Sequence, residues 1–156
     1  MPLTELFLDH LKVRLAYAGQ ALAAHGFDTL VISSGAPYTH FADDQEAPFH
    51  TVPHFRHYCP ITGPHHVLKL EPGKKPLLVR YAPEDFWYEQ LPLGTPFWSA
   101  GFDLIEAPTL EAVWNAVGRP ARAALGIKAV SGARASTATV TTSAVNNPEK
   151  RETAPA

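Results

Sequence analysis

A helix pattern followed at once by a buried-strand pattern constrains the fold more than any other feature. Between Thr4 and His25, apolar residues recur at steps of three and four, which predicts an amphipathic helix with one buried stripe; they are Leu8, Leu11, Leu15, Ala18 and Leu22. Gly26 suits the left-handed conformation that ends many helices. The continuous apolar run 30–32 favours a central strand covered on both faces. A helix followed by such a strand predicts an α/β fold.

The rest of the chain predicts a mixed β-sheet flanked by helices. We expect strands over 67–70 and 77–81 joined by a turn, a strand over 102–106, a helix over 109–117 ended by Gly118, and a last strand over 124–130. Residues 84–90 are compatible with a helical turn. The segment 35–64 lacks periodicity, and its five prolines interrupt any long helix. A loop of this length is usually functional or carries short strands.

Composition divides the chain into one domain and a tail. Hydrophobic residues make up 46% of the 156 residues, enough for a real core. We place this domain at residues 1–130. Residues 131–156 consist mostly of Ala, Ser and Thr, and contain no Leu, Ile or aromatic residue. Such a segment buries too little apolar surface to offset chain entropy, so we expect a flexible, low-complexity, disordered tail.

Charge and cysteine content exclude several classes of protein. The formal net charge is −2, and Lys and Arg do not cluster on one face, which argues against nucleic-acid or acidic-membrane partners. Cys59 is the only cysteine, so there is no internal disulfide, and we expect this residue to lie in the core. There is no run of about 18 apolar residues and no signal-peptide pattern. We therefore expect a cytoplasmic protein.

The adjacent carboxylates Asp43 and Asp44 are the first candidate site. They follow the predicted buried strand in a segment rich in proline and aromatic residues. Such a pair suits binding of a substrate ammonium group or a divalent cation, or acid–base work in which each raises the pKa of the other. Capping of a turn and solubility are the alternative role. The residues themselves leave both open.

The histidines and aromatic residues give weaker signals. His50, His54, His57, His65 and His66 lie near Cys59, but prolines interrupt them and no second cluster completes four ligands. We expect scattered surface or half-buried imidazoles. The aromatic clusters 86–88 and 97–98 are expected to fill core or interface, with a pocket rim as the minority alternative. No dinucleotide-binding, P-loop or serine-hydrolase motif occurs.

An ordered series of short motifs resembles one known family. In chain order these are Leu6-Phe-Leu-Asp-His10, Ser33-Ser-Gly35, Phe41-Ala-Asp-Asp44, Pro48-Phe49, Pro53-His-Phe55, Lys75-Pro-Leu77, Pro83-Glu-Asp-Phe-Trp87 and Phe97-Trp98. Over about residues 5–128 the chain resembles the creatinase/prolidase-type N-terminal domain of bacterial Xaa-Pro dipeptidases (prolidases), including their organophosphorus acid anhydrolase relatives.

The resemblance implies one half of a two-domain, pita-bread-type metallopeptidase. Members cleave dipeptides with a C-terminal proline, using two divalent ions, usually manganese. The ligands, two Asp, one His and two Glu, lie in the C-terminal catalytic domain. A two-metal centre activates a water and polarises the scissile carbonyl, and neither step is possible without those ligands. We therefore expect no catalytic residue, no bound metal and no hydrolysis from this chain alone.

The resemblance also assigns roles to two residues. Asp44 would face the ammonium group of a substrate, and Trp87 would border the same pocket. Family N-terminal domains make dimer contacts and lend residues to the neighbouring subunit's pocket. The expected partner is thus a second copy or a catalytic pita-bread domain, with dipeptide bound only in its presence.

Some positions depart from the family pattern. His50, His54 and His57 stand where the family has Lys, Gln and an apolar residue. After Ile127 the family pattern continues into a linker helix, and residues 131–156 lack that sequence pattern. A truncated chain, a frameshifted chain and a genuinely separate domain all stay open. A free-standing module that binds a partner protein or an amine-bearing ligand through Asp43-Asp44 is the alternative function, and metal binding by the histidine segment is a distant third.

Overall fold

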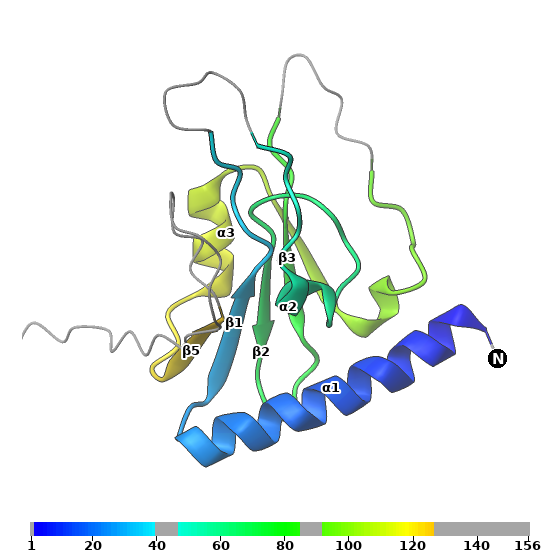
Figure 1. Ribbon diagram of the computed structural model, residues 1–156, viewed down its shortest axis with the longest axis vertical. Coiled ribbons are helices and arrows are strands. Elements are labelled where there is room, and N and C mark those ends of the chain that lie inside the picture. Colours follow the sequence, from blue (N-terminus) through cyan, green and yellow to red (C-terminus); the bar gives the residue numbers. More distant parts are fainter. Residues whose placement is uncertain (1, 40–46, 85–91, 127–156) are drawn as a thin grey trace, which may run out of the picture.

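The computed structural model describes residues 2–39, 47–84 and 92–126, which form an α/β fold around one five-stranded sheet (Figure 1). The strand order is β4-β3-β2-β1-β5. The elements, in chain order, are α1 (Leu3–His25), β1 (Thr29–Ser33), α2 (Pro53–Arg56), β2 (Val67–Leu70), β3 (Leu77–Tyr81), the 3₁₀ turn η1 (Ser99–Gly101), β4 (Asp103–Ala107), α3 (Leu110–Val117) and β5 (Ala123–Gly126).

The sheet is mixed, as the sequence predicts. β2 runs antiparallel to both of its neighbours, whereas β5 is parallel to β1 and β4 is parallel to β3. The predicted fold class, a mixed sheet flanked by helices, is confirmed. The predicted tail, residues 131–156, lies outside the described residues, so its disorder and the domain boundary at 130 stay predictions.

Helix α1 forms where the stripe of apolar residues predicts it. Leu11, Ala18 and Leu22 are its buried residues, and Leu11 and Ala18 belong to a core cluster that also contains residues of the sheet. Gly26 ends the helix with φ of 70°, and its N–H donates to the carbonyls of the last turn. The left-handed conformation costs glycine little because it has no Cβ.

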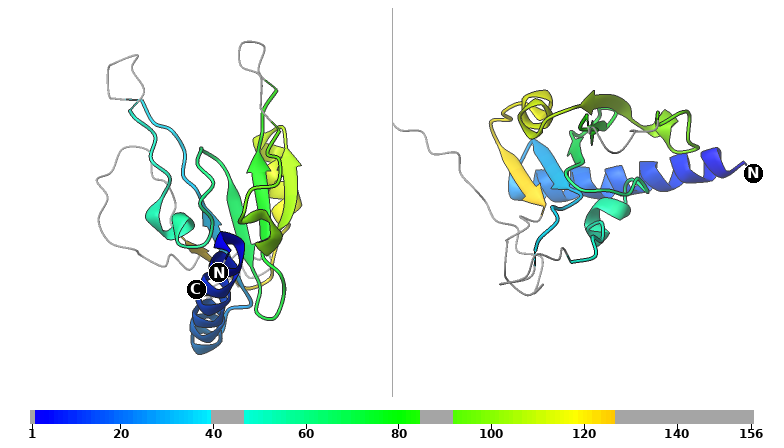
Figure 2. Two further views of the ribbon diagram at one scale, coloured as in Figure 1. Left: turned by 90° about the vertical axis from the view of Figure 1, so that its right-hand side faces the viewer. Right: turned by 90° about the horizontal axis from the view of Figure 1, so that it is seen from above.

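Two apolar clusters cover the two faces of the sheet. Because successive residues of a strand point to opposite faces, Ile32 of β1 packs in the cluster under α1, whereas Val31 packs in the cluster under α3. Both clusters use residues of β2 and β3 as well. Figure 2 shows α1 and α3 on opposite sides of the sheet. The continuous apolar run in β1 is thus a central strand covered on both faces, as predicted.

The remaining differences are small and local. The aperiodic segment 35–64 contains the short helix α2, which begins at Pro53, a residue suited to the first helical turn. β4 begins one residue later than predicted. Of the expected turn at 84–90, only Glu84 is described. No helix within the described ranges is long and apolar enough to cross a membrane.

Candidate functional site at the loop end of the sheet

The two segments that contain the predicted site residues are both entered from one end of the sheet. β1 and β3 point the same way, because both are antiparallel to β2, so they finish at the same end. We call this the loop end; it is uppermost in Figure 1. The chain enters 40–46 from β1 and 85–91 from β3. Asp43, Asp44 and Trp87 themselves fall within those two ranges, outside the described residues, so their roles stay predictions.

Ser34 ties three segments together at the loop end. Its side chain is fully buried. Its Oγ donates to the Gly63 carbonyl at 2.8 Å and accepts from the His66 N–H at 2.9 Å. The Ser34 N–H donates to the His66 carbonyl, and the Val52 N–H donates to the Ser34 carbonyl. The end of β1 is therefore held to the approach of β2 and to the segment that leads into α2.

His66 completes this network from the β2 side. Its Nδ1 accepts from the Tyr81 N–H at 3.0 Å, so Nε2 carries the proton and donates to the Thr62 carbonyl at 3.2 Å. Burial lowers the pKa of the imidazole; the Thr62 carbonyl opposes this, and Arg80 and His65 lower it further. The imidazole ring is thus neutral, and hydrogen bonds at both of its nitrogens fix its orientation. A Cβ on Gly63 would lie 2.7 Å from Nε2, so only glycine leaves room for the ring.

A cleft of about 530 Å³ with a mixed polar and apolar lining opens beside His66. Arg80, Tyr81 and Trp98 line it, with four prolines; these are Pro60, Pro64, Pro83 and Pro96. The Arg80 guanidinium donates to Glu106 Oε1 at 2.6 Å. The described residues of the cleft offer neither a nucleophile nor a free base.

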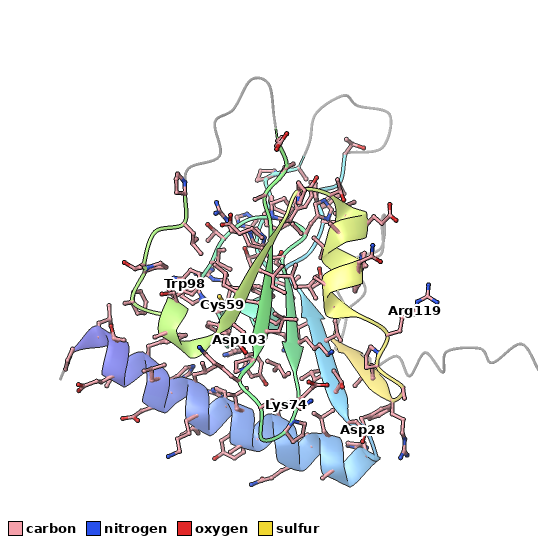
Figure 3. The ribbon with its side chains drawn as sticks, turned by 180° about the vertical axis from the view of Figure 1, so that it is seen from behind. Asp28, Cys59, Lys74, Trp98, Asp103 and Arg119 are labelled. Atoms are coloured by element: carbon pink, nitrogen blue, oxygen red, sulfur yellow. The ribbon has the colours of Figure 1, made fainter. Side chains whose placement is uncertain are left out.

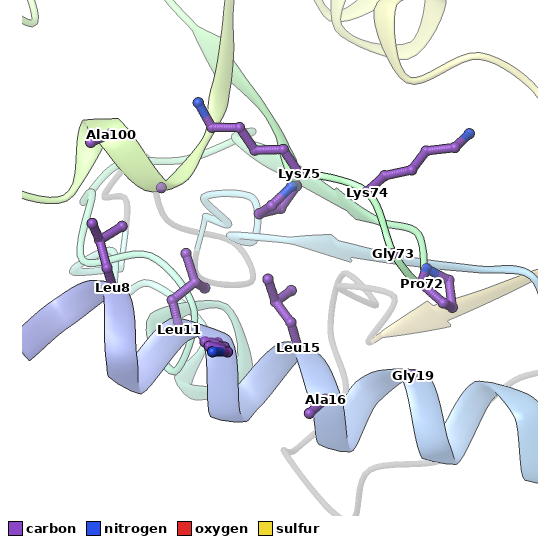
Figure 4. A pocket seen from close by; sticks show the side chains of 13 residues that line it. Leu8, Leu11, Leu15, Ala16, Gly19, Pro72, Gly73, Lys74, Lys75 and Ala100 are labelled. Atoms are coloured by element: carbon purple, nitrogen blue, oxygen red, sulfur yellow. The ribbon is translucent and has the colours of Figure 1, made fainter. Parts of the chain in front are cut away.

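A second groove lies between α1 and the turn that joins β2 to β3, far from the loop end (Figure 4). Its volume is about 550 Å³, and Leu8, Leu11 and Leu15 form its floor. Lys74 and Lys75 point in different directions at its rim. Each forms an ion pair with a carboxylate: Lys74 pairs with Glu71, and Lys75 pairs with Asp103. The two ammonium groups therefore do not converge on one ligand.

The histidines take two different roles. His50, His54 and His57 are exposed and His65 is half-buried, as expected. His66 differs, because it is 5% exposed and bonded on both ring nitrogens. Among the described residues, no group of three or more His, Cys, Asp or Glu is arranged to hold a metal ion.

The core predictions for Cys59 and Trp98 are confirmed. Cys59 is fully buried, and burial raises the pKa of its thiol to about 12. Trp98 is 6% exposed and meets Phe102 edge-on. Both belong to the cluster between the sheet and α1 (Figure 3). Phe97 differs from this expectation, because it is 38% exposed, and it packs edge-on against Phe7.

Residue-by-residue reasoning missed Ser34 and His66. The Ser33-Ser-Gly35 motif marks the position after β1, but it does not reveal the bonding partner. Ser34 and His66 are 32 residues apart in the chain, and only the pairing of β1 with β2 brings them together.

Comparison with known proteins agrees with this fold and its motifs. A family model described as the Xaa-Pro dipeptidase N-terminal domain matches residues 5–151. Among curated proteins, the Xaa-Pro dipeptidase of Xanthomonas campestris pv. campestris (strain B100) is 42% identical over 87 residues, 55% of this chain and 20% of the relative. The Xaa-Pro dipeptidase of Erwinia tasmaniensis is 36% identical over 104 residues, 66% of this chain and 24% of the relative. The Xaa-Pro dipeptidase of Shewanella pealeana is 34% identical over 103 residues, 65% of this chain and 23% of the relative.

These matches define the class and then the family. The mixed sheet with α1 and α3 on its two faces defines an α/β N-terminal domain of the dipeptidase type. The chain belongs to the Xaa-Pro dipeptidase N-terminal domain family. The regions that match cover about a fifth to a quarter of the length of these relatives. The resemblance drawn from the motifs is confirmed.

Proposed function

We propose that this chain is the non-catalytic N-terminal domain of a cytoplasmic, metal-dependent Xaa-Pro dipeptidase. The reaction is hydrolysis of dipeptides with a C-terminal proline. The two manganese ions belong to the catalytic domain. The described residues of this chain do not fit such a centre, since they offer no group of three ligands, so no metal-dependent step is assigned to them. Their role is to shape the substrate pocket and to make subunit contacts.

The observation that supports this proposal is that the two segments with predicted site residues follow strands that finish at the same end of the sheet. The segments with Asp44 and Trp87 follow β1 and β3, which finish at the same end of the sheet. A carboxylate complements the ammonium group of a dipeptide, and an indole complements its apolar part. The Ser34–His66 network braces the base from which both segments leave. Family membership supplies the reaction class.

The proposed partners are a second copy of the chain and a catalytic pita-bread domain. A substrate pocket bordered by the neighbouring subunit needs both. The alternative is a free-standing module that binds a protein or an amine-bearing ligand without hydrolysis. Calorimetry of the isolated chain with Leu-Pro distinguishes these two functions. A free-standing module binds the dipeptide on its own, whereas the proposed domain binds it only together with a catalytic domain.

A chimaera tests the pocket role directly. The matching N-terminal part of the Xanthomonas campestris dipeptidase is replaced by this chain, and manganese-dependent Leu-Pro hydrolysis is measured. Asp44→Asn is expected to raise KM by about 10- to 100-fold, because a hydrogen bond to a charged group contributes about 1.5–3 kcal/mol. Asp43→Asn is the matched control and is expected to leave KM nearly unchanged. Equal effects of the two changes, or hydrolysis by the unfused chain, would contradict the proposal.

A further inference from the structure

Strand β4 forms an uncovered edge of the sheet. Among the described residues it is the outermost strand on its side, and β3 is its one neighbour there (Figure 2). Residues 103–106 are all exposed. Two of them are large and apolar: Leu104 is 39% exposed and Ile105 is 42% exposed. An exposed apolar edge strand is a template for pairing with another strand.

The hydrogen bonds to β3 show which backbone groups of β4 face outward. The Asp103 N–H donates to the Pro76 carbonyl, and the Ala107 carbonyl accepts from the Ala82 N–H, both at 2.9 Å. Ile105 is in register with Val79 between them. Residues 103, 105 and 107 therefore direct their N–H and C=O groups toward β3. Since these directions alternate along a strand, Leu104 and Glu106 direct theirs away from the sheet.

The carboxylates that would ordinarily protect this edge are neutralised by the chain itself. Asp103 lies 3.4 Å from the Lys75 ammonium, and Glu106 lies 2.6 Å from the Arg80 guanidinium. Charged side chains on an edge strand normally repel a second strand. With both carboxylates paired inside the chain, the edge presents apolar side chains and backbone groups that have no partner among the described residues, and it carries no net charge. That chemistry fits a second edge of the same kind.

We infer that β4 pairs edge to edge and antiparallel with β4 of a second copy, about a two-fold axis at Ile105. This inference identifies the interface of the proposed homodimer. It rests on the proposed function only for the number of subunits. In this register Leu104 lies opposite the second copy's Glu106, and vice versa, so all the outward-facing groups of both residues find partners.

Other symmetric registers fit less well. An axis at Glu106 places the two Glu106 side chains opposite each other, which is destabilising for like charges. An axis at Leu104 moves Glu106 opposite Phe102, beyond the start of β4. With the axis at Ile105, Asp103 lies opposite Ala107, so no carboxylate opposes another. The two Ile105 side chains meet at the axis as a non-hydrogen-bonded pair.

Cysteine cross-linking tests both the pairing and the register. In a non-hydrogen-bonded pair the Cα atoms are about 4.5 Å apart, within the range for a disulfide. Ile105→Cys is therefore expected to give a covalent dimer on mild oxidation of the full chain. Leu104→Cys is the matched control and is expected to stay uncross-linked, because the two copies of position 104 are displaced by about 7 Å along the strands. Cys59 is fully buried and does not interfere.

Sedimentation equilibrium of the unmodified chain gives a second readout. Leu104→Pro removes one outward N–H without touching the bonds to β3, as proline is tolerated on an edge strand, and is expected to abolish the dimer. Leu104→Ala keeps that N–H and is expected to retain the dimer. A monomer at all accessible concentrations, or equal cross-linking of both cysteine variants, overturns the inference. Neither readout uses peptidase activity, so the interface and the proposed function fail separately.

Discussion

Replacing Ser34 with alanine tests the idea that one buried hydroxyl holds the loop end together. The Ser34 Oγ makes two hydrogen bonds, one to the Gly63 carbonyl and one from the His66 N–H. Alanine removes both and adds nothing that reaches either group. The His66 N–H is then buried without a hydrogen-bond partner. The Gly63 carbonyl is only partly buried, so water can replace part of its lost hydrogen bond.

The two lost bonds set the size of the effect. A buried polar group left without a partner costs about 1–3 kcal/mol, and an ordinary hydrogen bond contributes about 0.5–1.5 kcal/mol. We assign the larger cost to the His66 N–H and the smaller to the Gly63 carbonyl. The free energy of unfolding should fall by about 2–4 kcal/mol, a large share of the roughly 5–15 kcal/mol typical of a domain.

Urea unfolding followed by tryptophan fluorescence measures this loss. With a slope of about 2 kcal/mol per M, the midpoint should fall by about 1–2 M. Ser33→Ala is the matched control, because the Ser33 Oγ only accepts one longer bond, from the Gly35 N–H at 3.2 Å. It should cost about 0.5–1 kcal/mol. A Ser34→Ala protein as stable as the Ser33→Ala protein would refute the reasoning.

Two further predictions concern His66 and Gly101. Because burial lowers the pKa of His66 below its usual 6.5, the unfolded chain binds a proton that the folded chain resists. The contribution of the neutral His66 side chain to the free energy of unfolding is therefore complete above about pH 6.5 and falls as the pH drops below that value. In urea unfolding, the stability of His66→Gln should depend less on pH than that of the unchanged chain. An unchanged pH dependence would contradict this prediction. Gly101→Ala places a Cβ 2.7 Å from Leu11 Cδ2, where η1 meets α1. It should lower the free energy of unfolding by about 1–3 kcal/mol, whereas Ala100→Ser on the exposed neighbour should leave it within about 0.5 kcal/mol.

The sequence by itself determines the elements with strong local signals. α1 follows from its apolar spacing and Gly26, and α3 from a helix pattern that ends at Gly118. The structure adds that Thr109 Oγ1 caps α3 by accepting from the Ala112 N–H. β1, β2 and β3 follow from short apolar runs between turns. These signals are local because helix spacing, caps and turns depend on residues a few positions apart. The ordered motifs also identify the family.

Only the tertiary structure decides how the strands are ordered and what meets at their ends. The antiparallel pairing of β1 with β2 joins Ser34 to His66 across 32 residues, and no periodicity in the sequence carries that information. The sheet order likewise leaves β4 at the edge and directs the amides of Leu104 and Glu106 outward. The physical reason is that such contacts depend on the summed packing of the two apolar clusters. Local residue preferences cannot set them in advance.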